Sequence, residues 1–231
     1  MLRYEFLVLS LLFLAPGALV FLLRPDLRPL MRWAAVASLP FALTERWFYP
    51  EYWSPTFLFD LISVLGFGIE DLIFVVALGA FTTTAYAFVF RRRLEPRRAE
   101  AGPRLRNTGL LVAAVLLLAL SLLLLGLPML FATVAAEILA AVGMTLVRRD
   151  LVLPALLGGL IVALVYGVLC AIFAQLIPGV FERIWHTEAL IGRAVAGVPL
   201  EELLYAFASG AVATAAFPFA RDERYRPLSF R

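Results

Sequence analysis

The 231-residue sequence contains no lysine, one cysteine and one histidine. The single cysteine, Cys170, cannot form a disulfide or a thiolate metal site within one chain. Charged residues are also scarce, at 16%, whereas hydrophobic residues make up 63%. This composition is far more apolar than that of an ordinary soluble domain, so it indicates an integral membrane protein surrounded by lipid.

The sequence also lacks the motifs by which soluble cofactors are commonly bound. It has no glycine-rich phosphate loop, no dinucleotide fingerprint and no spaced aspartate pair that would hold Mg-diphosphate. The single histidine, His186, lies in the loop sequence "ERIWHTEAL". A lone loop histidine is more often solvated or capping than catalytic, and zinc sites need more ligands than this chain has. We therefore expect no cofactor, no metal ion and no nucleic-acid partner.

Long apolar runs predict the architecture, because a helix needs roughly 20 mostly apolar residues to cross a membrane. Seven such segments occur, near residues 4–23, 30–47, 69–90, 107–125, 128–147, 151–177 and 198–219. Gly126 and Pro128 separate the fourth segment from the fifth, because they break a run that is too long for one span. The predicted fold class is an all-α membrane protein with seven transmembrane helices. Six spans with a re-entrant segment are the alternative.

The orientation follows from the arginines, which provide all 20 basic residues. With seven spans, 16 arginines lie on one side of the membrane and four on the other. Basic residues are enriched on the cytoplasmic side, so we place the N-terminus outside the cell membrane and the C-terminus in the cytoplasm. Tryptophans near the ends of the spans are expected to anchor the chain in the interfaces. These are Trp33, Trp47, Trp53 and Trp185.

The sequence contains an internal repeat. Residues 66–88, "GFGIEDLIFVVALGAFTTTAYAF", align without a gap with residues 197–219, "GVPLEELLYAFASGAVATAAFPF". The aligned pairs include Glu70 with Glu201, Asp71 with Glu202, Gly79 with Gly210 and, in the preceding loops, Glu51 with Glu182.

The repeat predicts the domain organisation. Two parallel three-helix repeats span residues 1–90 and 128–220, and a basic cytoplasmic linker with a spacer helix, residues 91–127, connects them. A cytoplasmic tail, residues 221–231, follows. The spacer restores the orientation, so both repeats cross the membrane in the same sense and are related by an axis along the membrane normal.

Six acidic residues lie within or at the ends of the predicted spans, where ionisable groups are costly and usually face the bundle interior. They are Glu45, Glu70, Asp71, Glu137, Glu201 and Glu202. All six are expected in the outer half of the membrane. Two longer outer loops, residues 48–66 and 178–196, are expected to form amphipathic lids in the interface. The acidic pairs also have a simpler explanation as first-turn acids that complement a helix dipole, and Glu45 has one as an ion pair with Arg46.

Two stretches of the sequence resemble the small, membrane-embedded lycopene cyclases. The first, "LTERWFYPEYWSPTFLFDLISVLGFGIEDLIF", is similar to that family's acidic span end, aromatic-Pro-Glu-Tyr loop and closing acidic pair. The second, "ERIWHTEALIGRAVAGVPLEELLYAF", is similar to its Pro-x-Glu-Glu arrangement. Departures are Gly68 and Asp71, where the fuller motif has Pro and Glu, Glu45 in place of Asp, and Gln175, where an acid is expected.

The resemblance implies a flavin-independent enzyme of carotenoid biosynthesis that acts on lycopene or a related lipid-soluble polyene. A hydrocarbon has no polar group, so its cyclisation must begin with protonation of a terminal double bond. The cation is then attacked by a nearby double bond, and proton loss yields a β-type ring without net redox change. Paired carboxyl groups in an apolar site suit this reaction, because one of them can stay protonated.

The proton donor implied by the resemblance is Glu201 or Glu202, with the other four acids as partner acids or base. Adjacent helix positions point about 100° apart, so only one residue of each acidic pair can face the centre of a pocket. The alternatives are a non-catalytic carotenoid-binding or assembly protein and a carotenoid hydratase, in which water captures the cation. A homo-oligomer is also compatible with the sequence.

Overall fold

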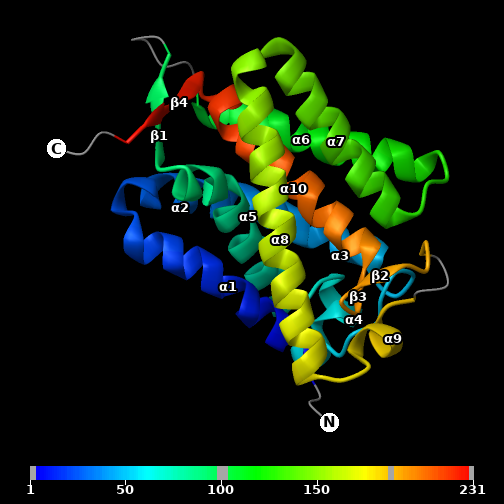
Figure 1. The fold of residues 1–231 in the computed structure, drawn as a ribbon. Coiled ribbons are helices and arrows are strands. Elements are labelled where there is room, and N and C mark those ends of the chain that lie inside the picture. Colours follow the sequence, from blue (N-terminus) through cyan, green and yellow to red (C-terminus); the bar gives the residue numbers. More distant parts are fainter. Residues whose placement is uncertain (1–3, 98–103, 187–189, 229–231) are drawn as a thin grey trace.

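The computed structural model describes residues 4–97, 104–186 and 190–228, so parts of the predicted linker, second lid and tail lie outside the described residues. The fold is a helix bundle (Figure 1). Among the described residues, six helices are long and apolar enough to cross a membrane. They are α1 (Glu5–Leu23), α5 (Ile69–Val89), α6 (Arg104–Leu124), α7 (Met129–Val147), α8 (Val152–Leu176) and α10 (Leu200–Ala220). The predicted all-α membrane class is therefore confirmed.

The second predicted span is not one continuous helix. It consists of α2 (Arg28–Ser38), the 3-10 segment η2 (Leu39–Thr44) and α3 (Glu45–Phe48), preceded by η1 (Pro25–Leu27). Pro40 lies at the start of η2 and has no N–H to donate to the turn before it, so the α-helical ladder stops there. A regular helix over residues 30–47 is therefore wrong, because the segment changes from α-helical to 3-10 geometry at the proline.

The turn predicted between the fourth and fifth spans is confirmed. Helix α6 ends at Leu124, and α7 begins at Met129 directly after Pro128. Gly126 adopts a φ of 92°, a left-handed conformation that glycine reaches without a steric penalty. The two helices consequently form a tight hairpin.

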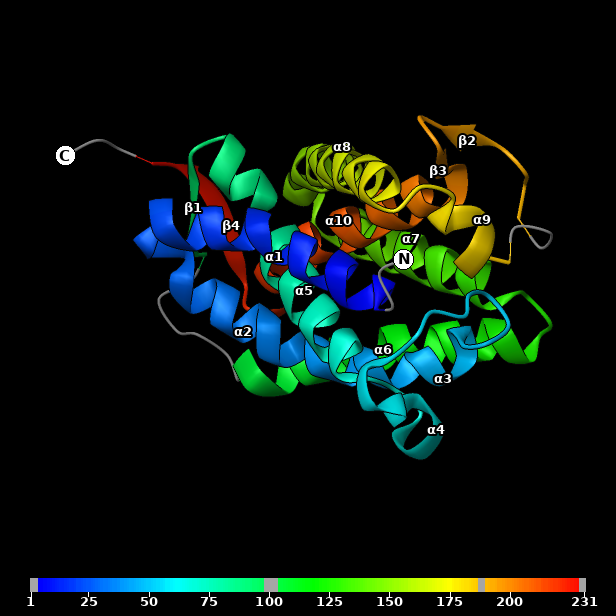
Figure 2. The ribbon, with the colours of Figure 1, turned by 90° about the horizontal axis from the view of Figure 1, so that it is seen from below.

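Helix α10 lies at the centre of the bundle (Figure 2). It packs against α8, α7 and α5, while α5 packs against α1 and α2. Two aligned glycines mark the closest crossings. A Cβ on Gly210 would lie 2.6 Å from the Val162 Cβ and 2.9 Å from the Gly158 carbonyl oxygen of α8, and one on Gly79 would meet Ser38 of α2. Both crossings thus need a residue without a side chain.

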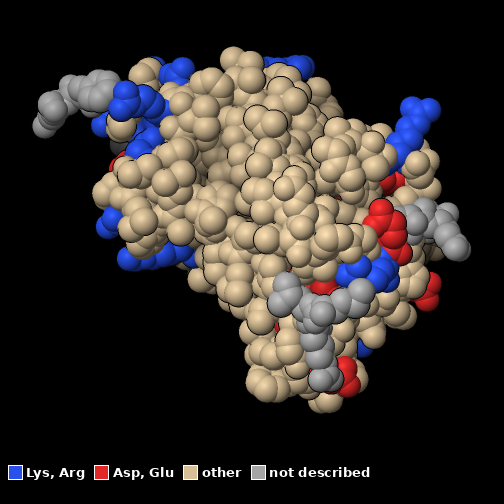
Figure 3. Space-filling model, turned by 60° about the horizontal axis from the view of Figure 1, so that its bottom comes forward, with Lys and Arg blue, Asp and Glu red and all other residues tan. Residues whose placement is uncertain are grey.

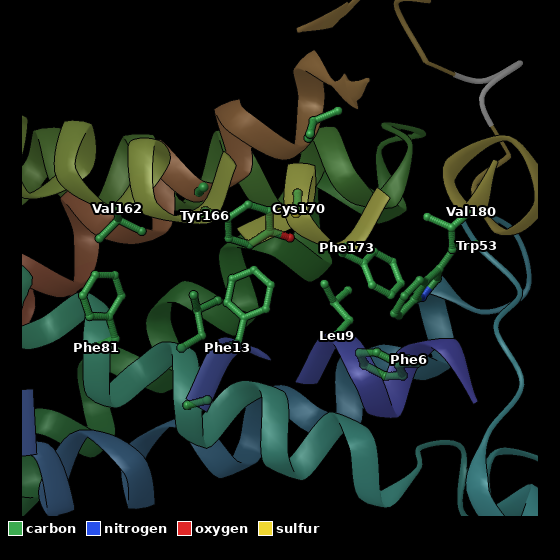
Figure 4. Packing of buried hydrophobic residues seen from close by; sticks show 14 of the residues in the cluster. Phe6, Leu9, Phe13, Trp53, Phe81, Val162, Tyr166, Cys170, Phe173 and Val180 are labelled. Carbon is green, nitrogen blue, oxygen red and sulfur yellow. The ribbon is translucent and has the colours of Figure 1, made fainter. Parts of the chain in front are cut away.

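Aromatic side chains fill the space between α1, α5 and α8 (Figure 4). Phe13 of α1 packs on Tyr166 of α8 with ring centroids 4.6 Å apart. Toward the N-terminal end of α1, Phe6 packs edge-on against Trp53 at 4.4 Å. This packing ties the first and second halves of the chain into one core.

At one end of the bundle, β1 (Arg92–Pro96) pairs with β4 (Glu223–Pro227) in an antiparallel ribbon centred on Leu94 and Tyr225. The sequence predicted only a hydrophilic linker and a tail in these places. Because the strands come from the ends of the two halves, their pairing closes the chain on itself at this end (Figure 1).

Beside the ribbon, Arg24 joins several backbone segments. It donates to both Asp26 carboxylate oxygens at 2.8 and 2.7 Å, and to the carbonyls of Ala87 and Arg92 at 3.0 and 2.7 Å. In the second half of the chain, next to η4 (Arg149–Leu151), an arginine makes the corresponding contacts. That residue is Arg148, which donates to Asp150, to the Pro218 and Glu223 carbonyls and, in addition, to Asp222 at 3.4 Å.

At the other end, the two predicted lid loops meet. They contain η3 (Leu58–Asp60), α4 (Leu61–Leu65), α9 (Val180–Ile184) and the short strand β2 (Ala194–Val195). Strand β2 pairs with β3 (Val198–Pro199), which follows the second loop. Trp53 and Trp185 form an antiparallel bridge between the loops, and their rings lie 5.0 Å apart. The loops therefore cover one end of the bundle together.

The surface matches a protein that lies in a bilayer. Figure 3 shows a broad uncharged face, with charged side chains near its edges. Large apolar side chains are exposed on α1, α6, α7 and α8. Monomeric soluble proteins rarely expose apolar area on this scale, which agrees with the membrane class.

Candidate active site

A large cavity runs through the bundle between α2, α5, α6, α7 and α10, and its lining is mostly apolar. Its volume is about 230 Å³. Four carboxyl groups face it, and they belong to Glu45, Asp71, Glu137 and Glu202.

The two acidic pairs divide in the same way, because only their second residues, Asp71 and Glu202, are among the described residues that line the cavity. Their first residues hold the lid loops instead. Glu70 accepts a hydrogen bond from the Leu58 backbone N–H at 2.7 Å, and Glu201 accepts one from the Ile191 N–H. The prediction that one residue of each pair faces the pocket is therefore confirmed.

Burial makes these two loop contacts strong constraints. Glu70 and Glu201 are 0% and 1% exposed. In each residue one oxygen binds the loop, and the other has no hydrogen-bond partner within the described part of the chain. Because a buried polar group without a partner costs free energy, removing the loop contact as well would leave these groups poorly satisfied.

Glu202 is held by three aromatic donors. The Tyr166 hydroxyl donates to Oε2 at 2.5 Å, the Trp185 indole N–H donates to Oε1 at 2.9 Å, and the Tyr52 hydroxyl donates to the same Oε1. Tyr52 and Trp185 come from the two lid loops and Tyr166 comes from α8. Three separate elements thus fix the position of one carboxylate.

Glu45 and Asp71 are the two cavity acids from the first half of the chain. Both carboxyl groups line the cavity, and they interact electrostatically. Glu45 also accepts a hydrogen bond from the Trp53 indole at 2.7 Å, and Asp71 accepts one from the Gly68 N–H at 2.7 Å. Gly68 is the N-cap of α5, so Asp71 keeps its capping role while it lines the cavity.

The alternative in which Glu45 pairs with Arg46 is not what the structure contains. Glu45 is only 7% exposed, its partners are Trp53 and Asp71, and no ion pair with Arg46 occurs among the described residues.

Glu137 lies two turns into α7 and is bound across helices. The Ser209 hydroxyl of α10 donates to both of its carboxylate oxygens, at 2.9 and 3.1 Å. Tyr205, one turn before Ser209 on α10, lines the same cavity and is within electrostatic reach of Glu137, Glu202 and Glu45. The four carboxyl groups, here called the carboxyl cluster, thus line one cavity together with this part of α10.

The predicted role of the tryptophans is wrong for two of the four. Trp33 and Trp47 are exposed, as interface anchors should be, but Trp53 and Trp185 are buried and donate to carboxylates. Aromatic belts and buried aromatic donors look alike in a sequence, because both occur at the ends of apolar spans.

Tyr52, Tyr166 and Ser209 are site residues that the sequence did not single out. His186 behaves as predicted, since its exposed side chain lies 3.1 Å from the Ser54 hydroxyl. No group of three or more His, Cys, Asp or Glu side chains that would hold a metal ion occurs in the part of the chain that the structure describes.

Comparison with known proteins identifies the second half of the chain. Residues 107–220 match the family model described as lycopene cyclase. The match contains Glu137, Glu201 and Glu202, and it ends with α10. Neither the curated proteins nor the solved structures that were searched contain a match. Residues 107–220 of the chain therefore belong to the lycopene cyclase family.

Proposed function

We propose that the chain cyclises lycopene or a related linear polyene within the membrane and forms a β-type ring without net redox change. Membership of the lycopene cyclase family connects it with carotenoid biosynthesis. The observation that carries the proposal is the gathering of Glu45, Asp71, Glu137 and Glu202 at an otherwise mostly apolar cavity. An apolar tunnel suits a hydrocarbon chain, and carboxyl groups are the acids and bases that its cyclisation needs.

The chemistry requires no activation beyond proton transfer. A carboxylic acid protonates the terminal double bond, and the resulting tertiary cation is attacked by a double bond further along the chain. A carboxylate then removes a proton, and a second carboxylate stabilises the positive charge in between. All groups needed for these steps come from one chain, so we propose that a single copy is sufficient and that a homo-oligomer is not required for the reaction.

We also propose that the chain crosses the membrane seven times as two three-helix repeats, residues 1–90 and 128–220, with residues 91–127 between them and a tail from 221. The broken segment α2–η2–α3 would then be the seventh crossing. If its pieces are collinear, it rises about 35 Å, which exceeds the ~30 Å hydrocarbon core. Matched contacts support the repeat, including the loop contacts of Glu70 and Glu201 and those of Arg24 and Arg148.

The basic residues support an orientation in the cell membrane with the N-terminus outside. In that orientation the β1–β4 ribbon with its arginines faces the cytoplasm, and the carboxyl cluster lies under the lid loops on the outer side. Cysteine-accessibility labelling tests this topology. Replacing the single Cys170 by Ala and introducing cysteine at Glu51 or at Arg226 should give labelling by an impermeant reagent in intact cells only at position 51.

Pigment analysis tests the function directly. The chain is expressed in a host that accumulates lycopene, and the carotenoids are separated and identified by mass and absorption spectrum. We expect monocyclic or bicyclic carotene. A hydroxylated acyclic product would instead indicate a hydratase, and unchanged lycopene with a correctly inserted protein would favour a binding or assembly protein.

A further inference from the structure

The carboxyl cluster is chemically asymmetric. Glu202 accepts three hydrogen bonds, from Tyr52, Tyr166 and Trp185, and makes none with another carboxyl group among the described residues. Donors that point at a carboxylate favour its charged form. Burial and the nearby Glu202 carboxylate raise the pKa of the Tyr52 phenol well above its usual value, so Tyr52 keeps its proton and remains a donor.

The first half of the chain provides a different arrangement. Among the described residues, Glu45 accepts one hydrogen bond from the Trp53 indole and Asp71 accepts one from the Gly68 N–H, so each has fewer donors than Glu202. Both carboxyl groups are buried at the same mostly apolar cavity, where two neighbouring carboxylates cannot both be charged at moderate cost. The pair Glu45-Asp71 is therefore equipped to hold a proton, and Glu202 is equipped to accept one.

We propose that the two halves of the chain divide the reaction. The Glu45-Asp71 pair donates the proton that starts cyclisation, and Glu202 removes the proton that ends it. Tyr52 and Tyr166 are positioning residues that hold the Glu202 carboxylate against one face of the cyclised cation. This division, which rests on the proposed function, makes Glu202 the residue that decides which ring type forms.

The ring type depends on the base because the cyclised cation can lose a proton from any carbon next to its charged centre. Each choice places the ring double bond differently. A freely moving base would give a mixture, whereas a carboxylate fixed by three donors from three elements reaches one of these carbons best. The hydrogen-bond cage of Glu202 therefore acts as a determinant of product specificity.

The proton balance of the cycle is simple. The O–H bond of the acidic pair breaks, and its proton forms a C–H bond at the terminal double bond. A ring C–C bond then forms. Finally, a C–H bond next to the cation breaks: its proton goes to Glu202, and its electron pair becomes the new ring double bond. The substrate is isomerised, and proton exchange with water restores both the pair and Glu202.

The test measures product isomers and solvent deuterium. Membranes containing the full chain are incubated with lycopene in D₂O, and the ratio of ring double-bond isomers and the deuterium per ring are measured. The variants are Glu202→Asp, Tyr52→Phe, Tyr166→Phe, Asp71→Asn and Glu45→Gln. Tyr225→Phe is the matched control. The partly buried Tyr225 hydroxyl lies at the other end of the bundle and donates to the Thr214 carbonyl at 2.9 Å.

We expect one solvent deuterium per ring and a single main isomer from the unmodified chain and from Tyr225→Phe. Glu202→Asp withdraws the carboxylate by one methylene, and the two Tyr→Phe variants loosen it, so the isomer ratio should change by about 10- to 100-fold. Asp71→Asn and Glu45→Gln should remove most cyclic product and most deuterium incorporation, because they act on the donor.

An isomer ratio that stays unchanged in Glu202→Asp, Tyr52→Phe and Tyr166→Phe would overturn the assignment of Glu202 as base. Full cyclisation by both Asp71→Asn and Glu45→Gln would overturn the assignment of the donor, while cyclisation by the unmodified chain would keep the proposed function standing. If the unmodified, membrane-inserted chain leaves lycopene unchanged, the proposed function fails, and the inference fails with it.

Discussion

The acidic motifs of the two halves are Glu70-Asp71 and Glu201-Glu202. Their first residues make the same kind of contact, whereas their second residues have different partners. Glu70 and Glu201 each bind a backbone N–H of their own lid loop. Asp71, one methylene shorter than its counterpart Glu202, turns back to cap its own helix at Gly68 and meets Glu45.

Glu202 instead reaches three aromatic donors from outside its helix. The first residue of the motif thus supports the structure in both halves, and the second was free to specialise. The proposed division of the reaction uses this difference, because it assigns one role to Asp71, where the family pattern has Glu, and another role to Glu202.

The largest expected effect concerns Glu202, the second residue of the second motif. Glu202→Gln should lower the yield of cyclic carotene by about 100-fold or more, because general acid–base groups contribute on that scale. Glu51→Gln is the matched control, since Glu51 is exposed on the first lid loop and should keep full activity. Pigment analysis with equal membrane levels of each variant measures this, and equal yields from both variants would remove Glu202 from the site.

The next effect compares the two glycine crossings. Gly210→Ala should destabilise the protein by about 2 kcal/mol, because the new methyl group would meet α8 backbone and the Val162 Cβ. Gly79→Ala should cost a comparable amount, because its Cβ would meet the Ser38 hydroxyl and would lie 2.8 Å from the Ser38 Cβ, which cannot rotate away. Thermal unfolding in detergent measures both variants. Gly143→Ala is the control, because its new methyl group meets nothing within 4 Å and should be neutral or stabilising. A loss of stability in Gly143→Ala equal to that of Gly210→Ala would contradict the crossing argument.

Replacing the first residue of either motif should have a smaller effect on stability, and the effect should be the same in both halves. Glu70→Ala and Glu201→Ala each leave one loop N–H without its acceptor, at Leu58 and Ile191, which should cost about 1–2 kcal/mol. Limited proteolysis of each variant should open the lid loop of its own half first. Cleavage of the opposite loop, or no change in either, would show that these residues do not hold the lids.

The smallest effect concerns the other end of the bundle. Arg24→Ala and Arg148→Ala should each lower the stability by about 1 kcal/mol, because each removes hydrogen bonds to two backbone carbonyls and a partly exposed carboxylate. Arg93→Ala, which removes only an exposed pair with Glu95, should change little. Matched losses for Arg24 and Arg148 would strengthen the proposed repeat, and unequal losses would weaken it.

Hydropathy and residue pattern alone determined the membrane class, the positions of six long helices and the turn at Gly126. These features depend on local sequence, because a span needs only enough consecutive apolar residues and a turn needs only residues that break a helix. The same reasoning found all four carboxyl groups of the cavity, since ionisable groups in a span are rare enough to stand out. It failed at residues 30–47, where the apolar run continued through a helix-breaking proline.

Only the tertiary structure decided which acids line the cavity and which acids bind a lid loop. Adjacent acids in a sequence are equivalent until the packing of α10 turns Glu202 toward the cavity and Glu201 toward its loop. Tyr52, Tyr166 and Trp185 have no sequence motif in common. They become partners of one carboxylate only when the lid loops and α8 meet. Hydrogen bonding depends on distances of about 3 Å between groups that the chain alone does not bring together, so the division of the cluster belongs to the fold.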